Sequence, residues 1–369
     1  MVADVGMPTP REPQEGPWHC AGMSSACRPP VPGDAAMVST AVPQLAELLD
    51  VLRVVQIPMR IRFRGVTVRE AVLIRGPQGW GEFSAFPEYD DPESSRWLAA
   101  ALEAGWVGWP DPVRDAIPVN ATVPSVPACE VAAVLARYDG CTTAKVKVAE
   151  RGQRLGDDLD RVAAVRDVMG PAARIRVDAN GGWAVPDAVD ALDRLSAYGL
   201  EYAEQPCAAV GELAALRVAL ARAGIDVLVA ADESIRRASD PMRVVREGAA
   251  DVIVVKVSPL GGVRSALEIA QECGLPTVVS SALDTSVGIR AGLALAAALP
   301  ELPFACGLST VELLAGDVTD DSLVPRAGSI GLRDLTVDPE LLDRWQAPPE
   351  REQWWRARVA RCHELLMDS

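Results

Sequence analysis

The sequence of 369 residues predicts an α/β fold in which parallel strands close into a barrel. Beyond residue 117, short apolar runs recur at a spacing of roughly 24 to 31 residues, with amphipathic helical runs between them. The apolar runs end near Val123, Lys147, Asp178, Glu204, Asp232, Lys256, Ser280 and Phe304. Eight strand–helix units of this size are typical of a TIM-type (β/α) barrel, although an open doubly wound sheet shares the alternation.

Residues 1–40 are predicted to be a disordered N-terminal extension. Pro, Gly, Ser and Ala dominate this segment without any periodicity, so it has no reason to form a packed element. Met37 is an alternative start of the chain, and residues 1–36 would then not belong to the native protein.

An α+β capping domain is predicted from residues 50–115 together with about 307–369. Strand-like runs broken at Gly65, Gly76 and Gly79 predict an antiparallel meander, and SSRWLAAALEAG predicts the helix that follows it. The tail has no ninth repeat and is expected to pack back on the meander, ending in a helix around EQWWRARVARCHELL.

The barrel itself is predicted over residues 117–306. Its helices are expected at runs such as DDLDRVAAVRDVMG, PDAVDALDRLSAYG and VRSALEIAQECG, which are amphipathic at a helical period. Active sites of such barrels lie at the C-terminal ends of the strands, so the residues found there carry the functional prediction.

Lysine occurs only at Lys145, Lys147 and Lys256, while every other basic position apart from the two histidines is arginine. A buried lysine amine can lose its proton, whereas an arginine in a protein cannot. A codon bias against lysine would not leave two survivors at the end of one strand and the third at the end of another. The lysines are therefore predicted to be a titrating, catalytic set.

Three carboxylates end three successive strands between those lysines: Asp178, Glu204 and Asp232. One acid at a strand end is commonly a helix N-cap, but three in succession are better explained by a shared cation. Carboxylates that point into a common space raise one another's pKa, and a divalent cation removes this conflict. Oxygen ligands without His or Cys favour Mg²⁺, with Mn²⁺ as a substitute. Such a metal would stabilise an enediolate while a neutral lysine takes the proton alpha to a carboxylate.

The runs TAKVKVA, RVDANGGW, YAEQP, ADES and VVKVSPLGG resemble motifs of the enolase superfamily, specifically of its muconate-lactonising subgroup. The resemblance covers roughly residues 50 to 345 and implies a modified barrel whose capping domain closes over the substrate. It implies the metal ligands Asp178, Glu204 and Asp232, the facing amines Lys147 and Lys256, and Lys145 as an electrostatic neighbour of Lys147.

Within this subgroup, RFRGVTVRE, KVSPLGG and SSALDTSVG are similar to the actinobacterial members that dehydrate 2-succinyl-6-hydroxycyclohexa-2,4-diene-1-carboxylate in menaquinone biosynthesis. That likeness implies a hydro-lyase acting on a small dianionic molecule by syn elimination. Lys147 would remove the alpha proton and return it to the departing hydroxide, and Lys256 would lie over the opposite ring face as a cation.

Several further residues are candidates for substrate contact. Ser280 and Ser281 could hydrogen-bond the succinyl carboxylate, and Gly261 with Gly262 could offer backbone N–H groups to an anion at a helix start. Arg64 in the capping domain could close over the substrate. A tight turn and an exposed turn arginine are the ordinary structural readings of the glycine pair and of Arg64.

Asn180 and Glu233 lie beside the predicted ligands in sequence. Asn180 is a candidate for substrate binding, and both residues are candidates for outer partners that hold the ligand set. Ordinary loop and cap roles are the alternative for each.

Other functions remain open beside the dehydratase. Lysines on opposite faces also suit an N-succinylamino acid racemase or a dipeptide epimerase. Dipeptide epimerases typically carry Asp-x-Asp after the eighth strand, where this chain has Gly307-Leu308-Ser309, and this departure weakens that alternative. A catalytically silent barrel acting as a scaffold is a remote alternative, because all five charged strand-end residues are present.

Composition narrows the class of protein. A net charge of −15 and a pI near 4.7 argue against nucleic acid or membrane as partners. No apolar run of about eighteen residues and no N-terminal signal pattern is found, so we expect a cytoplasmic protein. Eight cysteines without C-x-x-C spacing predict reduced, mostly buried thiols. His19 and His363 are expected at the surface or in a tail. The sequence predicts no oligomeric state.

Overall fold

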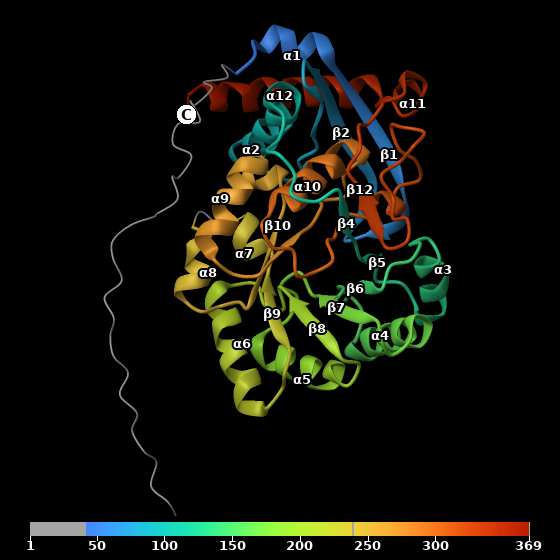
Figure 1. Cartoon of the computed structure of the whole chain (residues 1–369), viewed down its shortest axis with the longest axis vertical. Coiled ribbons are helices and arrows are strands. Elements are labelled where there is room, and N and C mark those ends of the chain that lie inside the picture. Colours follow the sequence, from blue (N-terminus) through green and yellow to red (C-terminus); the bar gives the residue numbers. More distant parts are fainter. Residues whose placement is uncertain (1–41, 238–239, 369) are drawn as a thin grey trace, which may run out of the picture. The chain divides into compact units, whose positions relative to one another are not determined.

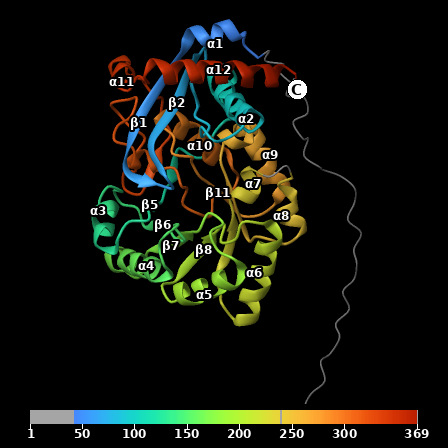
Figure 2. The ribbon, with the colours of Figure 1, turned by 180° about the vertical axis from the view of Figure 1, so that it is seen from behind.

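Seven parallel strands form the barrel sheet in the order β11-β10-β9-β8-β7-β6-β5 (Figures 1 and 2). The structure is a computed structural model that describes residues 42–237 and 240–368, so the predicted extension of residues 1–40, with His19, lies outside the described residues. The strands are β5 (Ala121–Val123), β6 (Thr143–Lys147), β7 (Arg174–Asp178), β8 (Leu200–Glu204), β9 (Leu228–Ala231), β10 (Val252–Val255) and β11 (Thr277–Val279). The predicted barrel is confirmed. The open doubly wound sheet is excluded, because neighbouring strands follow chain order from β5 to β11 without the reversal that a doubly wound sheet has.

The eighth strand, expected to end near Phe304, is not part of the regular ladder. The barrel is closed two to three residues later by isolated parallel bridges, Val119 with Cys306 and Ser280 with Gly307. Pro300 and Pro303 lack the N–H group that a strand needs at each paired position, so the segment before Cys306 cannot form a longer ladder. No α-helix follows this closure directly, and the chain turns through the 3-10 helix η4 (Thr310–Leu313) towards the antiparallel sheet.

Helices cover the outside of the barrel (Figure 1). They are α3 (Val131–Leu135), α4 (Leu155–Met169), α5 (Val185–Ser196), α6 (Val210–Ala223), α7 (Glu233–Arg236), α8 (Met242–Arg246), α9 (Val263–Cys273) and α10 (Ser286–Ala298), with the 3-10 turns η2 (Ala128–Glu130) and η3 (Ser258–Leu260). The predicted helical runs correspond to α4, α5 and α9, and they continue three residues beyond the end of α5 and one residue beyond the ends of α4 and α9. In α5 the start and end follow from local chemistry, with Pro186 and Asp187 in the first turn and Arg194 in the last.

A second, three-stranded sheet is antiparallel in the order β1-β2-β3, as the meander predicts. Its elements and those that follow or pack near it are α1 (Leu45–Val51), β1 (Leu52–Phe63), β2 (Val66–Gly76), β3 (Gly79–Phe83), α2 (Asp91–Leu102), the π turn η1 (Glu103–Val107), β4 (Ala116–Pro118), β12 (Ser329–Gly331), α11 (Pro339–Arg344) and α12 (Pro349–Met367). We call β1, β2, β3, α1, α2 and α12 the antiparallel layer. Arg64 and Gly65 have positive φ angles of 48° and 86°, which make the tight turn between β1 and β2.

The C-terminal helix α12 packs against α1 and α2 at the far end of the antiparallel layer from the barrel (Figure 2). Trp355 of α12 is fully buried and meets Phe83 edge to face, with ring centroids 5.5 Å apart. His363, expected at the surface or in a tail, is instead 8% exposed, and its ring nitrogen lies 2.8 Å from the carbonyl oxygen of Pro43. His363 lies in the tail but not at the surface, because the tail packs on the N-terminal part of the layer.

Two further predictions about the chain can be placed. The six described cysteines are free, and four of them are buried, while Cys129 is exposed. Within residues 42–237 and 240–368, no helix is long and apolar enough to cross a membrane.

Candidate active site

The alternation of side chains along the barrel strands places the charged residues inside the barrel. On β8, Ala203 packs outward into the core beneath the helices, while Tyr202 packs into the small apolar cluster inside the barrel. Glu204 therefore follows Tyr202 on the inner side, because successive strand residues point to opposite faces. The same alternation puts Lys145, Lys147, Asp178, Asp232, Lys256 and Ser280 on that side.

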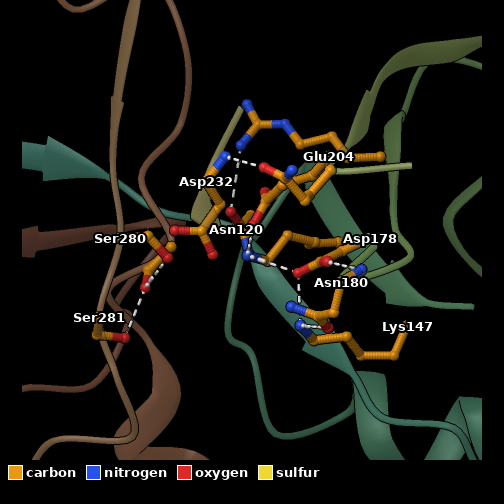
Figure 3. Close-up of polar contacts among 12 residues, drawn as sticks. Asn120, Lys147, Asp178, Asn180, Glu204, Asp232, Ser280 and Ser281 are labelled. Carbon is orange, nitrogen blue, oxygen red and sulfur yellow. Dashed lines mark hydrogen bonds and ion pairs between the residues drawn. The ribbon is translucent and has the colours of Figure 1, made fainter. Parts of the chain in front are cut away.

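Strand register then brings these residues together. Lys147 pairs with Asp178, and Asp178 pairs with Glu204, across three neighbouring parallel strands. Asp232 and Lys256 come one residue after β9 and β10 end, so these two strands are one residue shorter than predicted. Figure 3 shows the three carboxylates gathered in one place, with Lys147 on one side and Ser280 and Ser281 on the other.

Each carboxylate contacts a cationic side chain. The ammonium nitrogen of Lys145 lies 2.9 Å from Glu204 and 3.4 Å from Asp178. Lys147 lies 2.5 Å from Asp178, and Lys256 lies 2.5 Å from Asp232. All three lysine side chains are at most 10% exposed. The two predicted catalytic amines therefore flank the carboxylates, with β7, β8 and β9 between their strands.

Burial and charge shift the pKa values of this group in different directions. Burial, together with the charge of Asp178, raises the pKa of Glu204 to about 7. Burial would lower the pKa of Lys145, but attraction to Glu204 and Asp178 outweighs it and raises the pKa. Burial lowers the pKa of Lys147, and the nearby charge of Lys145 adds to this effect. The pKa values of the two β6 lysines are thus shifted in opposite directions, and Lys147 is the one that loses its proton more readily.

The residues fit a divalent cation in their chemistry, although their side chains are arranged as ion pairs. Among the described residues, no three Asp, Glu, His or Cys side chains are grouped as metal ligands, because lysines lie between the carboxylates. Oxygen Oε2 of Glu204 is buried and has no hydrogen-bond partner. A buried carboxylate oxygen without a donor is costly, and a cation bound to it would remove that cost. Three buried carboxylates are a hard, oxygen-only ligand set.

Asn180 and Glu233 extend the cluster beyond the carboxylates. The side-chain oxygen of Asn180 accepts a hydrogen bond from Lys147 at 2.8 Å, and its amide nitrogen donates to Glu233 at 3.1 Å. Arg236 also donates to Glu233, at 2.7 Å, and to Asp232, at 3.1 Å. Asn180 therefore contacts Lys147 directly. Glu233 is connected to Lys147 through Asn180 and to Asp232 through Arg236.

A cavity opens beside this cluster, and Ser280, Ser281 and Arg64 line it. Ser281 is within 2.7 Å of the Thr310 hydroxyl and donates to the carbonyl of Gly307 at 2.8 Å. Arg64 is not an exposed turn residue: it donates to the carbonyls of Val148, at 2.9 Å, and Asp178, at 3.2 Å. The β1–β2 turn is thereby held against the strand ends that carry the lysines.

Gly261 and Gly262 do not line this cavity. An anion does lie at the start of α9, but it is the carboxylate of Glu103, which accepts hydrogen bonds from the backbone N–H groups of Val263 and Arg264. A Cβ atom on Gly262 would lie 2.3 Å from that carboxylate, so glycine is needed for the close approach. The predicted substrate contact at this helix start is corrected to a contact within the chain.

The cavity also has lining residues that the sequence analysis did not name. They are Phe63, Val66, Phe86, Glu88, Tyr89, Thr122, Arg236, Ala282, Leu283 and Thr310. Arg236 follows Asp232 by one helical turn, and that spacing was a usable signal. Phe63 ends β1, whereas Phe86 and Tyr89 lie between β3 and α2. These aromatic residues carry no local pattern that separates them from core residues.

Comparisons with known proteins identify the family of the chain. Residues 54–105 match the family model described as Enolase N-terminal domain-like, and residues 129–336 match the model described as Enolase C-terminal domain-like. The chain is 56% identical to an o-succinylbenzoate synthase of Thermobifida fusca, over 84% of this chain and 94% of the relative. It is also 56% identical to an o-succinylbenzoate synthase of Mycolicibacterium smegmatis, over 89% of this chain and 100% of the relative.

Solved structures share the fold at lower identity. A muconate lactonizing enzyme from Pseudomonas fluorescens has a TM-score of 0.68 at 21% identity, covering 80% of this chain and 98% of that one. An L-Ala-D/L-Glu epimerase from Bacillus subtilis has a TM-score of 0.65 at 24% identity, covering 78% and 96%. Because muconate lactonizing enzymes and epimerases share this fold, the fold alone does not select the reaction.

Proposed function

The chain belongs to the o-succinylbenzoate synthases of the enolase superfamily, and we propose which of its residues perform each part of the reaction. The reaction is the syn loss of water from 2-succinyl-6-hydroxycyclohexa-2,4-diene-1-carboxylate, which yields 2-succinylbenzoate. The enzyme is thus a carbon–oxygen hydro-lyase of menaquinone biosynthesis. One observation carries the assignment of roles: two buried lysines flank three buried carboxylates on successive strands.

Lys147 is the base in this proposal. Its amine takes the proton from the carbon alpha to the ring carboxylate, and the C–H electron pair forms the new ring double bond. The C–O bond to the hydroxyl group breaks as that double bond forms, and its electron pair leaves with the oxygen. Lys147 returns the same proton to this oxygen, so the products are water and an aromatic ring. A single base on one face is sufficient because the elimination is syn.

Lys256 and Lys145 supply charge rather than proton transfer. Lys256 lies on the other side of the carboxylates and remains a cation over the opposite face of the ring. Lys145 lies between Glu204 and Asp178, and its raised pKa keeps it protonated beside Lys147. A permanent neighbouring cation favours the neutral form of the Lys147 amine, which is the form that can accept a proton.

Enolase superfamily members use a divalent metal ion, and we propose Mg²⁺ here, with Mn²⁺ as a substitute. Asp178, Glu204 and Asp232 would hold it, and Glu204 has an unpartnered oxygen available. The bound ion supplies positive charge beside the substrate carboxylate, which makes the alpha proton more acidic. Lys145, Lys147 and Lys256 would then give up their direct ion pairs and become free to meet the substrate.

The substrate proposed for the cavity is a small dianion. Ser280 and Ser281 lie opposite Lys147 and would hydrogen-bond the succinyl carboxylate, which does not react (Figure 3). Arg64 and Asn180 would complete the closed site, the first by holding the β1–β2 turn over the strand ends and the second by orienting Lys147. The antiparallel layer would act as the cap, with the 307–369 tail completing it.

The acidic charge of the chain and the six free cysteines among the described residues support the remaining proposals, that the enzyme acts in the cytoplasm and binds neither nucleic acid nor membrane. Cell fractionation with an activity assay would check the location. Activity found mainly in a membrane or secreted fraction would contradict it.

N-succinylamino acid racemisation is a second candidate activity, because Lys147 and Lys256 approach from two sides. Dipeptide epimerisation is weaker, since Leu308 and Ser309 are buried without a carboxylate where a substrate amine would need one. The test is an elimination assay followed by loss of diene absorbance, beside racemisation and epimerisation assays in deuterated water. We expect efficient dehydration, slower or no racemisation and no epimerisation. Faster epimerisation than dehydration would keep the superfamily assignment and overturn this function.

A further inference from the structure

One wall of the cavity is a loop in an unfavourable backbone conformation. Residues Ser280 to Leu283, between β11 and α10, line the cavity, and Leu283 has a φ angle of 66°. This left-handed conformation is unfavourable for a residue with a Cβ atom and persists only where surrounding contacts impose it. Those contacts therefore determine where this wall lies.

Arg69 provides the contact at Leu283 itself. It belongs to β2 of the antiparallel layer and is 2% exposed. Its Nε donates to the carbonyl oxygen of Leu283 at 3.2 Å, and its Nη2 donates to the carbonyl of Ser84. The guanidinium carbon lies 4.4 Å from the centre of the Phe86 ring, which lines the same cavity. One side chain thus connects two walls of the cavity, formed by the segments that follow β11 of the barrel sheet and β3 of the antiparallel sheet.

Glu82 anchors the other end of the loop. It belongs to β3, is 4% exposed, and accepts hydrogen bonds from Thr285, through N–H at 3.1 Å and hydroxyl at 2.6 Å, and from the N–H of Gly288 at 3.0 Å. A carboxylate from the antiparallel layer therefore caps the N-terminus of barrel helix α10. A Cβ atom on Gly288 would lie 2.6 Å from Asp284, so this packing leaves no room for a larger residue.

Asp284 completes the buried cluster. It is 6% exposed, and one of its carboxylate oxygens accepts a hydrogen bond from the N–H of Ala282 at 3.0 Å, while the other has no partner. Arg69 is the cation that attracts both Glu82 and Asp284. Its planar, fixed arrangement of donors lets it bind two carbonyl groups and balance two carboxylates at once.

We propose that Arg69 is a positioning residue for the substrate, which sets the distance between the Leu283 and Phe86 walls and so determines how tightly the dianionic cyclohexadiene is held. Arg69 lines no part of the cavity and does not touch the reacting atoms. Its effect therefore acts on substrate binding and leaves proton transfer by Lys147 unchanged. This inference rests on the proposed dehydration for its kinetic readout.

The test compares Arg69→Lys with Arg75→Lys, a matched change at an exposed arginine of the same strand. Lysine keeps the charge but has no planar group to bind both carbonyls. We expect KM to rise roughly 10-fold or more for Arg69→Lys, with kcat within about 3-fold of the wild type and no change for Arg75→Lys. Unchanged KM, or a kcat loss without a KM change, would overturn the inference.

A second variant and a hydrogen-exchange measurement distinguish failure of this inference from misfolding and from failure of the proposed function. If Arg69→Lys folds poorly, the double variant Arg69→Gln with Asp284→Asn removes one charge of each sign and should show the same rise in KM. Hydrogen exchange needs no substrate: the amides of Ala282, Thr285 and Gly288 should exchange at least about 10-fold faster in Arg69→Lys, while those of α5 should not change. Unchanged exchange at the loop refutes positioning by Arg69. Absence of dehydration in the wild type refutes the proposed function instead.

Discussion

Two buried clusters of carboxylates and cations lie within the same chain and differ in how their charges are satisfied. In the barrel, Asp178, Glu204 and Asp232 are paired with three lysines, and one oxygen of Glu204 has no partner. Between the antiparallel layer and the barrel, Glu82 and Asp284 lie near one arginine, and Glu82 accepts hydrogen bonds from two backbone N–H groups and a hydroxyl. The first cluster borders the cavity, and the second lies behind its wall.

Buried carboxylates with cationic partners therefore serve two different purposes in this chain. A lysine ammonium is a compact charge on a flexible stem that can lose its proton, so its ion pairs can be exchanged during a reaction. An arginine keeps its charge and its donor geometry, and backbone donors are fixed by the fold. The lysine cluster is therefore suited to change partners, and the arginine cluster is suited to hold two parts of the molecule in place.

Metal removal should give the largest effect and should act on the lysine cluster alone. Chelation should lower dehydration by roughly 10³-fold or more, with Mg²⁺ or Mn²⁺ restoring it and zinc doing so poorly. The fold should persist, because each carboxylate can pair with a cationic side chain. The measurements are activity and melting temperature before and after chelation. Full activity after exhaustive chelation would refute the metal site.

The same substitution at the two flanking lysines should separate their roles. Lys147→Arg keeps the charge and removes the base, so turnover should fall by roughly 10²- to 10⁴-fold with the fold intact. Lys256→Arg keeps the charge that this residue is proposed to supply, so its loss should be clearly smaller. Turnover and circular dichroism of both variants provide the comparison. Near-normal turnover by Lys147→Arg would remove it as the base.

The sequence predicted the lysine cluster far better than the arginine cluster. Lys147, Asp178 and Glu204 each end a parallel strand, and such ends meet at one edge of the sheet, so local pattern was enough to group them. The contact of Arg69 with Leu283 joins residues 214 positions apart, and no periodicity encodes it. Burial of His363 and capping of α9 by Glu103 depend in the same way on packing between distant segments.

A smaller effect is expected for the pH dependence of stability in the arginine cluster. Burial, together with Asp284, raises the pKa of Glu82 from its ordinary 4.5 to about 7, while Arg69 and Thr285 oppose the rise. Glu82 therefore binds a proton more tightly in the native state than in the unfolded state. The stabilisation that this proton gives the fold is fully present below pH 4.5 and is lost as the pH rises through about 7.

Glu82→Gln tests this directly, because glutamine cannot titrate. Between pH 5 and pH 7.5 the wild type should lose roughly 1 to 3 kcal/mol more unfolding free energy than the variant. Urea unfolding at four pH values in that range measures the two slopes. Asp284→Asn is the companion variant, since burial also raises the pKa of Asp284. Equal slopes for the wild type and Glu82→Gln would show that Glu82 does not carry the proton.

Deleting residues 1–36 should have the smallest effect and should spare both clusters. The contacts that define the lysine and arginine clusters are all made by residues from Arg69 to Gly288, so the deletion removes none of them. The composition of residues 1–36 also offers no packing surface. Melting temperature, kcat and KM should therefore match those of the full chain. A rise in KM alone would indicate that the extension acts on the cavity wall, whereas a fall in kcat alone would indicate that it reaches the lysine cluster.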